Sequence, residues 1–184
     1  LMSIRSKVIK DIVWSDNDNT NATSWTPIGS AIYPYTGTFD GGGHRIIGLS
    51  NENVSTKPQN AGLFGNVSTV GIVRNIGIEN ANIEGTINVG AIAGVNSGTI
   101  EKCYVSGGQL TGSNSGSDNV QLGGLVGQNN NGTVQNCYVC NGCTLSSAAT
   151  DHFANIGGLV GSNNSIVKNC YSNIANLTDT GSST

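Results

Sequence analysis

The sequence contains few charged residues, few aromatic residues and very little proline. Only 10% of its 184 residues are charged and 5% are aromatic, and it has three prolines and two histidines. A typical soluble domain carries about 25% charged residues. The net charge of -3 gives no electrostatic attraction to nucleic acids or anionic membranes. No apolar run approaches the roughly 20 residues that span a bilayer, so we expect no nucleic-acid partner and no membrane insertion.

The residue clusters of common metal sites are also missing. His44 and His152 are the only histidines, and no His-Glu-x-x-His motif is present. Cys140 and Cys143 form one Cys-x-x-Cys pair, whereas a zinc site needs about four ligands. A loop rich in Asp and Asn, residues 15–24, lacks the glycine and the bidentate glutamate of a calcium-binding loop. We therefore expect no metal and no cofactor, with calcium at this loop as the less favoured alternative.

Glycine, in contrast, is abundant, with 27 residues, and much of it lies in a phrase that returns four times. The phrase spans residues 61–65, 90–94, 123–127 and 157–161, and its clearest copies read Gly-Gly-Leu-Val-Gly. The closing glycines are 29, 33 and 34 residues apart. Self-similarity at such a period is typical of solenoids, in which each repeat buries its apolar face against its neighbours.

Alignment of the repeats predicts four apolar columns. Because side chains two apart on a strand share a face, these columns should line a common interior. We therefore predict an all-β, right-handed parallel β-helix of about five to six coils, with three stacked and reduced cysteines. The columns are Leu63, Ile92, Leu125 and Leu159; Ile76, Cys103, Cys137 and Cys170; Ile78, Val105, Val139 and Ser172; and Ile83, Leu110, Leu145 and Leu177.

Two further columns should face outward. Tyr104, Tyr138 and Tyr171 should stack beside Gly77, and they are our candidate ligand-binding residues. Arg74, Glu101, Gln135 and Lys168 form the other column, in which Arg74 and Glu101 are expected to pair. Two loops rich in Ser and Asn, Thr111–Val120 and Ser146–Asn155, should lie on one side of the stack and add to the same contact surface.

A glycine turn precedes the repeats. Residues 37–39 and 45–49 are predicted to be short strands on either side of Gly41–Gly43. We interpret Asp40 as accepting backbone N–H bonds in this turn and His44 as an exposed side chain. The alternative is a catalytic pair formed by these two residues.

We expect one solenoid domain over residues 1–184, with N-terminal coils over 1–60 and four repeats over 61–184. Residues 8–14 are predicted to form a strand, although residues 4–13 also fit a helical period. Nothing after the last repeat resembles a cap, so we expect the chain to be a fragment of a longer protein.

The phrases resemble the GLUG motif of bacterial surface and secreted proteins. Gly124–Gly127, Gly158–Gly161 and Asn131–Tyr138 carry the resemblance, and Trp25–Gly29 and Gly37–Gly41 resemble the segment that precedes such repeats. The resemblance covers about residues 25–178 and implies a right-handed parallel β-helix in adhesin-like proteins. The family also occurs in the non-catalytic N-terminal part of metallopeptidases that cleave immunoglobulin A. It brings no catalytic residue to this chain.

The favoured hypothesis is a non-catalytic, extracellular module, on the cell surface or secreted, that acts as an adhesin-like binder or as a spacer. Its partner would be a host or microbial surface glycan or protein. The alternative is a carbohydrate-active β-helix enzyme, a lyase or glycosidase, but glycoside hydrolysis needs two carboxylates about 5 to 9.5 Å apart, and the eleven acidic residues are spread thinly. An ice or mineral binder is a third possibility, although Ile72 and Ile166 interrupt the column of Thr99 and Thr133.

Overall fold

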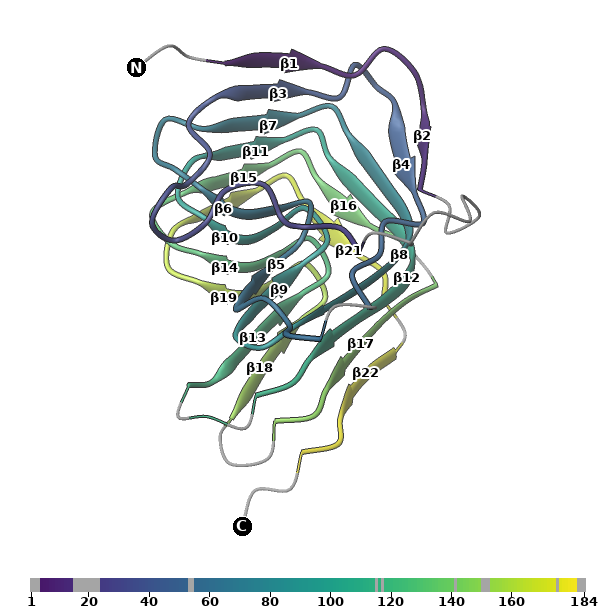
Figure 1. Ribbon diagram of the computed structural model, residues 1–184, viewed down its shortest axis with the longest axis vertical. Helices are drawn as coiled ribbons and strands as arrows, with labels where there is room; N and C mark the ends of the chain where they lie inside the picture. The colour runs from purple at the N-terminus through teal and green to yellow at the C-terminus, as the bar shows by residue number, and fades with distance from the viewer. Residues whose placement is uncertain are drawn as a thin grey trace.

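The chain folds into a stack of parallel coils (Figure 1). A computed structural model describes residues 4–14, 24–52, 55–114, 116, 118–140, 142–149, 153–174 and 176–181. These residues form strands, turns and loops and contain no helix, hence none that could serve as a membrane span. The predicted fold class, an all-β parallel solenoid, is confirmed.

Four parallel sheets form the walls of the solenoid. Sheet A contains β1 (Arg5–Lys7), β3 (Thr38–Asp40), β7 (Ile72–Arg74), β11 (Thr99–Glu101), β15 (Thr133–Gln135) and β20 (Ile166–Lys168). Sheet B contains β2 (Ile12–Val13), β4 (Arg45–Ile47), β8 (Gly77–Gly85), β12 (Tyr104–Gly112), β16 (Tyr138–Val139), β17 (Cys143–Ser147), β21 (Tyr171–Ser172) and β22 (Asn176–Asp179).

The other two sheets have four strands each. Sheet C contains β6 (Phe64–Val67), β10 (Ala93–Asn96), β14 (Val126–Asn129) and β19 (Val160–Asn163). Sheet D contains β5 (Asn60–Ala61), β9 (Asn88–Gly90), β13 (Val120–Gly123) and β18 (Ala154–Gly157). From β5 onward the chain passes through the sheets in the order D, C, A, B and then begins the next coil.

The repeated glycine phrase forms the corner between sheets D and C. In the third repeat, β13 ends at Gly123 and β14 begins at Val126, so two residues, Gly124 and Leu125, make the corner. A Cβ at Gly123 would collide with the carbonyl oxygen of Val126, so the corner requires glycine there. Leu125 lies inside the corner and is fully buried.

The predicted core columns exist with the predicted register. Leu110 is paired with Ile83 on one side and with Leu145 on the other, and Val105 lies between Ile78 and Val139. Column members in the middle coils are at most 2% exposed. The last coil differs because the described residues provide no further coil to cover it, and Leu177 there is 49% exposed.

In each of the four repeats, a single residue with a left-handed backbone makes the corner between sheets A and B. Asparagine adopts this conformation more readily than other residues with a side chain, and it occupies three of the four corners. The fourth corner holds Lys102. The φ angles are 54° at Asn75, 53° at Lys102, 54° at Asn136 and 55° at Asn169.

A ladder of buried amides runs along the corner between sheets C and A. Asn96 Nδ2 donates to Asn129 Oδ1 at 2.9 Å, and Asn129 Nδ2 donates to Asn163 Oδ1 at 2.8 Å. Asn96 and Asn129 are completely buried, and each also donates to a backbone carbonyl. The ladder therefore satisfies polar groups that would otherwise be buried without partners.

Two local predictions were wrong. Residues 8–14 form neither one strand nor a helix, because β1 and β2 lie on different sheets and residues 8–11 turn the corner between them. Arg74 and Glu101 are neighbours, but Arg74 pairs with Asp40 on the other side, with 3.1 Å between Nε and Oδ2. Glu101 instead accepts a 2.8 Å hydrogen bond from Gln135 Nε2.

Candidate functional site

The three predicted tyrosines form a continuous ladder along the start of the strands of sheet B. Tyr104 and Tyr138 are paired in register, as are Tyr138 and Tyr171. Their ring centroids are 5.3 Å apart in both pairs, with interplanar angles of 9° and 4°. Each ring therefore covers the face of the next, and the solvent-facing side of the ladder consists of ring edges and hydroxyl groups. A ligand beside the ladder meets these edges rather than open ring faces.

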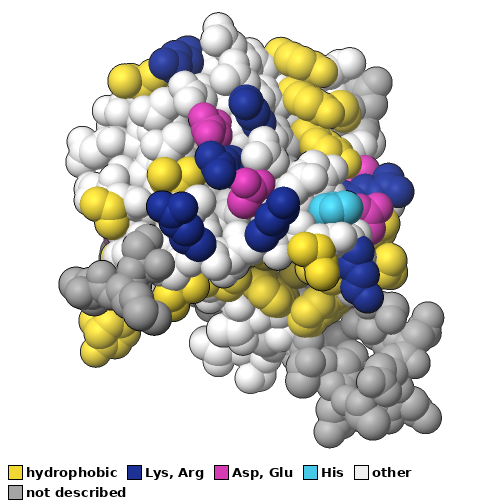
Figure 2. All heavy atoms as spheres, turned by 90° about the horizontal axis from the view of Figure 1, so that it is seen from above, with side chains coloured by type: hydrophobic (Ala, Val, Ile, Leu, Met, Phe, Trp, Pro, Cys, Tyr) yellow, Lys and Arg dark blue, Asp and Glu magenta, His cyan; other side chains and the backbone are white. Residues whose placement is uncertain are grey.

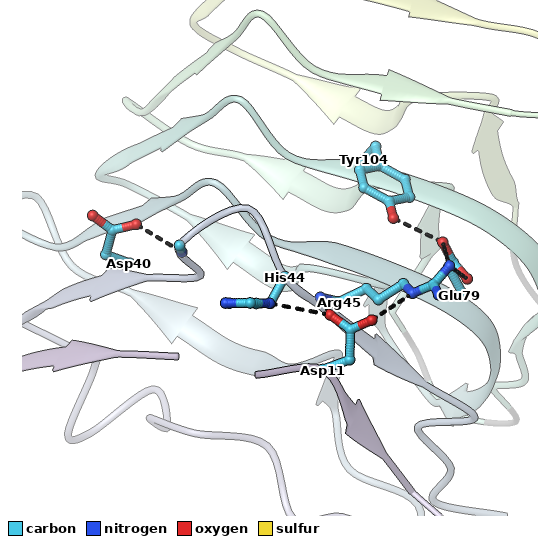
Figure 3. Close-up of polar contacts among 7 residues, drawn as sticks. Asp11, Asp40, His44, Arg45, Glu79 and Tyr104 are labelled. Atoms are coloured by element: carbon cyan, nitrogen blue, oxygen red, sulfur yellow. Dashed lines mark hydrogen bonds and ion pairs between the residues drawn. The ribbon is translucent and has the colours of Figure 1, made fainter. Parts of the chain in front are cut away.

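A glycine, Gly77, lies next to the first tyrosine of the ladder. Gly77 is paired in register with Tyr104, and a Cβ at position 77 would collide with the Tyr104 ring. The Tyr104 hydroxyl donates a 2.7 Å hydrogen bond to Glu79 Oε1 (Figure 3). Burial, followed by the hydrogen bond and the negative charge of Glu79, raises the pKa of Tyr104 to about 12.

A charged cluster from the N-terminal coils holds Glu79 in place. Arg45 lies next to Gly77 in the sheet and contacts Glu79 Oε2 through Nη1 at 3.1 Å. Its Nε donates to Asp11 Oδ2 at 2.9 Å (Figure 3). The hydrogen bond that Arg45 donates lowers the pKa of Asp11, and the hydrogen bonds that Arg45 donates to Asp11 and Glu79 raise the pKa of Arg45.

His44 joins this cluster rather than Asp40. Its Nδ1 lies 3.2 Å from Asp11 Oδ1, so an Nδ1–H group donates to this carboxylate and Nε2 faces away from it. Asp40 accepts hydrogen bonds from Gly42 N at 2.9 Å and from Asn75 Nδ2 at 3.0 Å. The turn role predicted for Asp40 is confirmed, whereas His44 is only partly exposed.

The tyrosine ladder borders a shallow groove of about 280 Å³. Its lining includes His44, Asn75, Lys102, Tyr104, Asn136 and Tyr138. These residues come from the corners between sheets A and B and from the first positions of sheet B. Sequence reasoning identified the tyrosines of this set as binding residues and considered His44 only as an alternative catalytic partner of Asp40. The signal for Lys102 was present in the repeat, where Asn occupies the same position in the other three units.

The two polar loops lie next to each other, as predicted, but away from the ladder. Val120 N donates to Phe153 O at 3.1 Å, and Phe153 N donates to Asn119 Oδ1 at 3.2 Å. Tyr104 begins β12 and Gly112 ends it, so the nine-residue length of this strand separates the ladder from the loops. The structure therefore splits the predicted contact surface into two. Residues 115, 117 and 150–152 of these loops lie outside the described residues.

The cysteines form a ladder of free thiols. All five are free, and Cys103, Cys137 and Cys143 are buried. Cys103 N donates to Cys137 Sγ at 3.4 Å, and Cys137 N donates to Cys170 Sγ at the same distance. Burial raises the pKa of Cys103 well above its usual value. Cys137 Sγ and Cys170 Sγ thus each accept a backbone hydrogen bond from the preceding coil.

No group of three or more potential metal ligands occurs in the described part of the chain. Cys140 and Cys143 are both free thiols, and Cys143 is buried, with a pKa raised to about 11 by that burial. His152 and residues 15–23 of the loop considered for calcium lie outside the described residues. The described residues thus offer no cluster of three such side chains for a metal ion.

Comparisons with known proteins agree with this repeat architecture. Residues 118–140 match the model of the GLUG motif. The chain carries the GLUG motif. These residues run from the loop before β13, through the D–C corner, to the residue after β16. The matched segment includes Leu125, Cys137 and Tyr138. The resemblance predicted from the sequence is confirmed for this repeat.

Halomucin from Haloquadratum walsbyi is 35% identical over 117 residues, or 62% of this chain. The chain spans only 1% of the length of that protein. A crystal structure described as a "putative immunoglobulin A1 protease from Bacteroides ovatus" superposes with a TM-score of 0.50 and 18% identity. The match covers 93% of this chain and 69% of that one, and it supports the fold.

Proposed function

We propose that this chain is a non-catalytic, surface-associated module of adhesin type that binds a saccharide along the tyrosine ladder. The observation that carries the proposal is the groove of about 280 Å³ between the ladder and the A–B corners. The GLUG motif and the relative named halomucin support an extracellular location, on the cell surface or secreted. A spacer without a ligand is the simpler version of the same hypothesis, and binding would distinguish the two.

A lateral site follows from how the core is filled. The interior columns consist of apolar side chains in contact, including Leu110, Leu125 and Val134, all with 0% exposure. A close-packed interior has no room for a ligand, so contact must use the outer walls, as in other solenoids. On the face seen in Figure 2, lysines and arginines outnumber the acidic side chains that lie among them. The binding of a neutral saccharide along this wall should depend only weakly on salt, because it forms no ion pair.

The carboxylates beside the groove are poorly suited to glycoside hydrolysis. Asp11 and Glu79 both contact Arg45, and the pKa of Asp11 is lowered. A general acid for sugar cleavage needs a raised pKa, and its partner carboxylate must be free to act on water or on the sugar. This argues against the lyase or glycosidase alternative.

The proposal is tested by measuring binding of the chain to a panel of neutral and acidic oligosaccharides. Tyr138→Ala, which removes the central ring of the ladder, should weaken binding at least about tenfold. Phe153→Ala is the matched control, because it removes an aromatic side chain that is 74% exposed in the distant loop. That variant should bind within about twofold of the wild type.

Two results would overturn this assignment. One is a panel without any bound saccharide, and the other is loss of binding in Phe153→Ala with full binding in Tyr138→Ala. If the chain released reducing ends from a bound saccharide and Glu79→Gln abolished this release, the proposal that the module is non-catalytic would be overturned. Far-ultraviolet circular dichroism of each variant shows whether the solenoid is intact.

A further inference from the structure

We propose that Lys102 is a specificity residue and that the groove beside the tyrosine ladder takes an acidic saccharide, whose carboxylate binds the Lys102 ammonium group. The inference rests on the proposed function, because it names the ligand class of the same groove. Its starting point is a single departure from the repeat at the corner between sheets A and B.

Lys102 occupies a backbone position suited to asparagine. Its φ angle of 53° matches those of Asn75, Asn136 and Asn169 within two degrees. A left-handed conformation costs a residue such as lysine more than it costs asparagine, whose short side chain bonds locally. The corner with Lys102 is therefore less stable than it would be with asparagine, the residue at the same place in three other coils. Such local conflicts between sequence and structure concentrate at functional sites.

Lys102 also interrupts a line of amide contacts along the corners. Asn169 Nδ2 donates to Asn136 Oδ1 at 3.3 Å, and Asn75 Nδ2 donates to Asp40 Oδ1. Lys102 lies between Asn75 and Asn136 in the stack and has no acceptor oxygen to continue the line. Its side chain instead brings a positive charge to the groove lining.

The charges around the groove leave this ammonium group available. Among the residues that the structure describes, Arg45, Lys57 and Arg74 each form an ion pair, and Lys102 forms none. The nearby carboxylates have other partners, since Asp11 and Glu79 contact Arg45, and Glu101 accepts from Gln135. The groove lining contains no acidic residue.

The remaining groups of the lining suit the hydroxyl groups of a sugar. His44 Nε2 lies on the side of the ring away from Asp11 and can accept a hydroxyl proton (Figure 3). Asn136, further along the same groove, is exposed, and the edges of Tyr104 and Tyr138 form the wall. One cation with neutral donors and acceptors around it fits a sugar ring that carries one carboxylate.

The deciding variant is Lys102→Asn, which restores the asparagine of the other corners and removes the charge. If Lys102 serves binding, this variant should melt at the same temperature as the wild type or higher. It should bind a galacturonate oligosaccharide at least about fivefold more weakly, as expected for the loss of one ion pair of about 1 kcal/mol. Lys168→Gln is the matched control, because it removes a lysine of sheet A in favour of the residue found one coil earlier, Gln135. It should leave affinity unchanged.

The outcomes separate the two proposals. In one outcome, a neutral oligosaccharide binds as tightly as the galacturonate, Tyr138→Ala weakens the binding of both, and Lys102→Asn weakens the binding of neither. This outcome would overturn the acidic ligand but would still support a binding site at the ladder. A lower melting temperature in Lys102→Asn would assign the lysine a structural role and overturn its role in specificity. If neither saccharide binds the wild type, both proposals fail. A sulfated oligosaccharide of equal length shows whether a carboxylate is required, and tighter binding of the sulfated chain would contradict the carboxylate assignment.

Discussion

Tyr104 Oη lies 2.7 Å from Glu79 Oε1, and the bond between them joins the tyrosine ladder to the charged cluster of the N-terminal coils. Glu79 in turn contacts Arg45, which contacts Asp11. Three residues from three coils thus fix the position of the first ring, on which Tyr138 and Tyr171 stack. The ladder is preorganised from this end, which reduces the entropy lost when a ligand binds beside it.

The first prediction concerns the titration of Tyr104. Its pKa is raised to about 12 in the folded state, whereas a free tyrosine titrates near about 10. Because the folded pKa lies above the unfolded one, this stabilising contribution is complete below about pH 10 and is lost as the pH rises through 12. Glu79→Gln should lower the pKa toward 10, measured by ultraviolet absorption of the phenolate. An unchanged titration in this variant would contradict the role of Glu79.

The second prediction concerns the buried amide ladder. Asn129 is fully buried, donates to Asn163 and accepts from Asn96. Asn129→Ala should therefore lower the free energy of unfolding by roughly 2 to 4 kcal/mol, because it removes the acceptor of one buried Asn96 N–H and the donor to nearby carbonyl groups. Asn163→Ala, at the exposed end of the same ladder, should cost less than about 1 kcal/mol. Urea denaturation of both variants measures the difference, and equal losses would contradict this view.

The sequence predicted the parts of the fold that depend on the repeat. Leu63, Ile92, Leu125 and Leu159 stack as predicted, because a solenoid turns an alignment of repeats directly into strand register. Tyr104 and Tyr138 were placed outward for the same reason, since adjacent strand residues alternate in direction. Periodicity thus specifies which residues are neighbours between coils.

The remaining features depend on information that the repeat does not contain. Asp11 and Arg45 belong to N-terminal coils without the glycine phrase, so no alignment could bring them together. The separation of the ladder from the polar loops depends on the nine-residue length of β12, which the alignment did not show. Lys102 aligned with three asparagines, but the alignment did not show that this position has a left-handed backbone, which is less favourable for lysine than for asparagine.

The third prediction concerns the thiol ladder. Titration of the denatured, unreduced chain should give five free thiols, as the structure has them. Cys137→Ala should lower the free energy of unfolding by about 1 to 2 kcal/mol, because it removes a buried side chain and the acceptor for Cys103 N. Cys137→Ser keeps an acceptor there and should cost less than the alanine variant. Three thiols in the titration would instead indicate one disulfide bond, and a costlier serine variant would show that the acceptor is unimportant.

The last prediction compares two leucines of the same core column. Leu125 lies between Ile92 and Leu159, is fully buried and donates its backbone N–H to Leu159 O. Leu159 belongs to the last coil and is only partly buried. Leu125→Ala should lower the free energy of unfolding by about 3 to 5 kcal/mol, because neighbouring coils on both sides prevent the cavity from collapsing. Leu159→Ala removes the same atoms where only one neighbouring coil packs against them, so it should cost about half as much or less. Chemical denaturation followed by circular dichroism measures both losses. Equal losses would mean that the last coil is as well packed as the middle one, contrary to the exposure of its side chains.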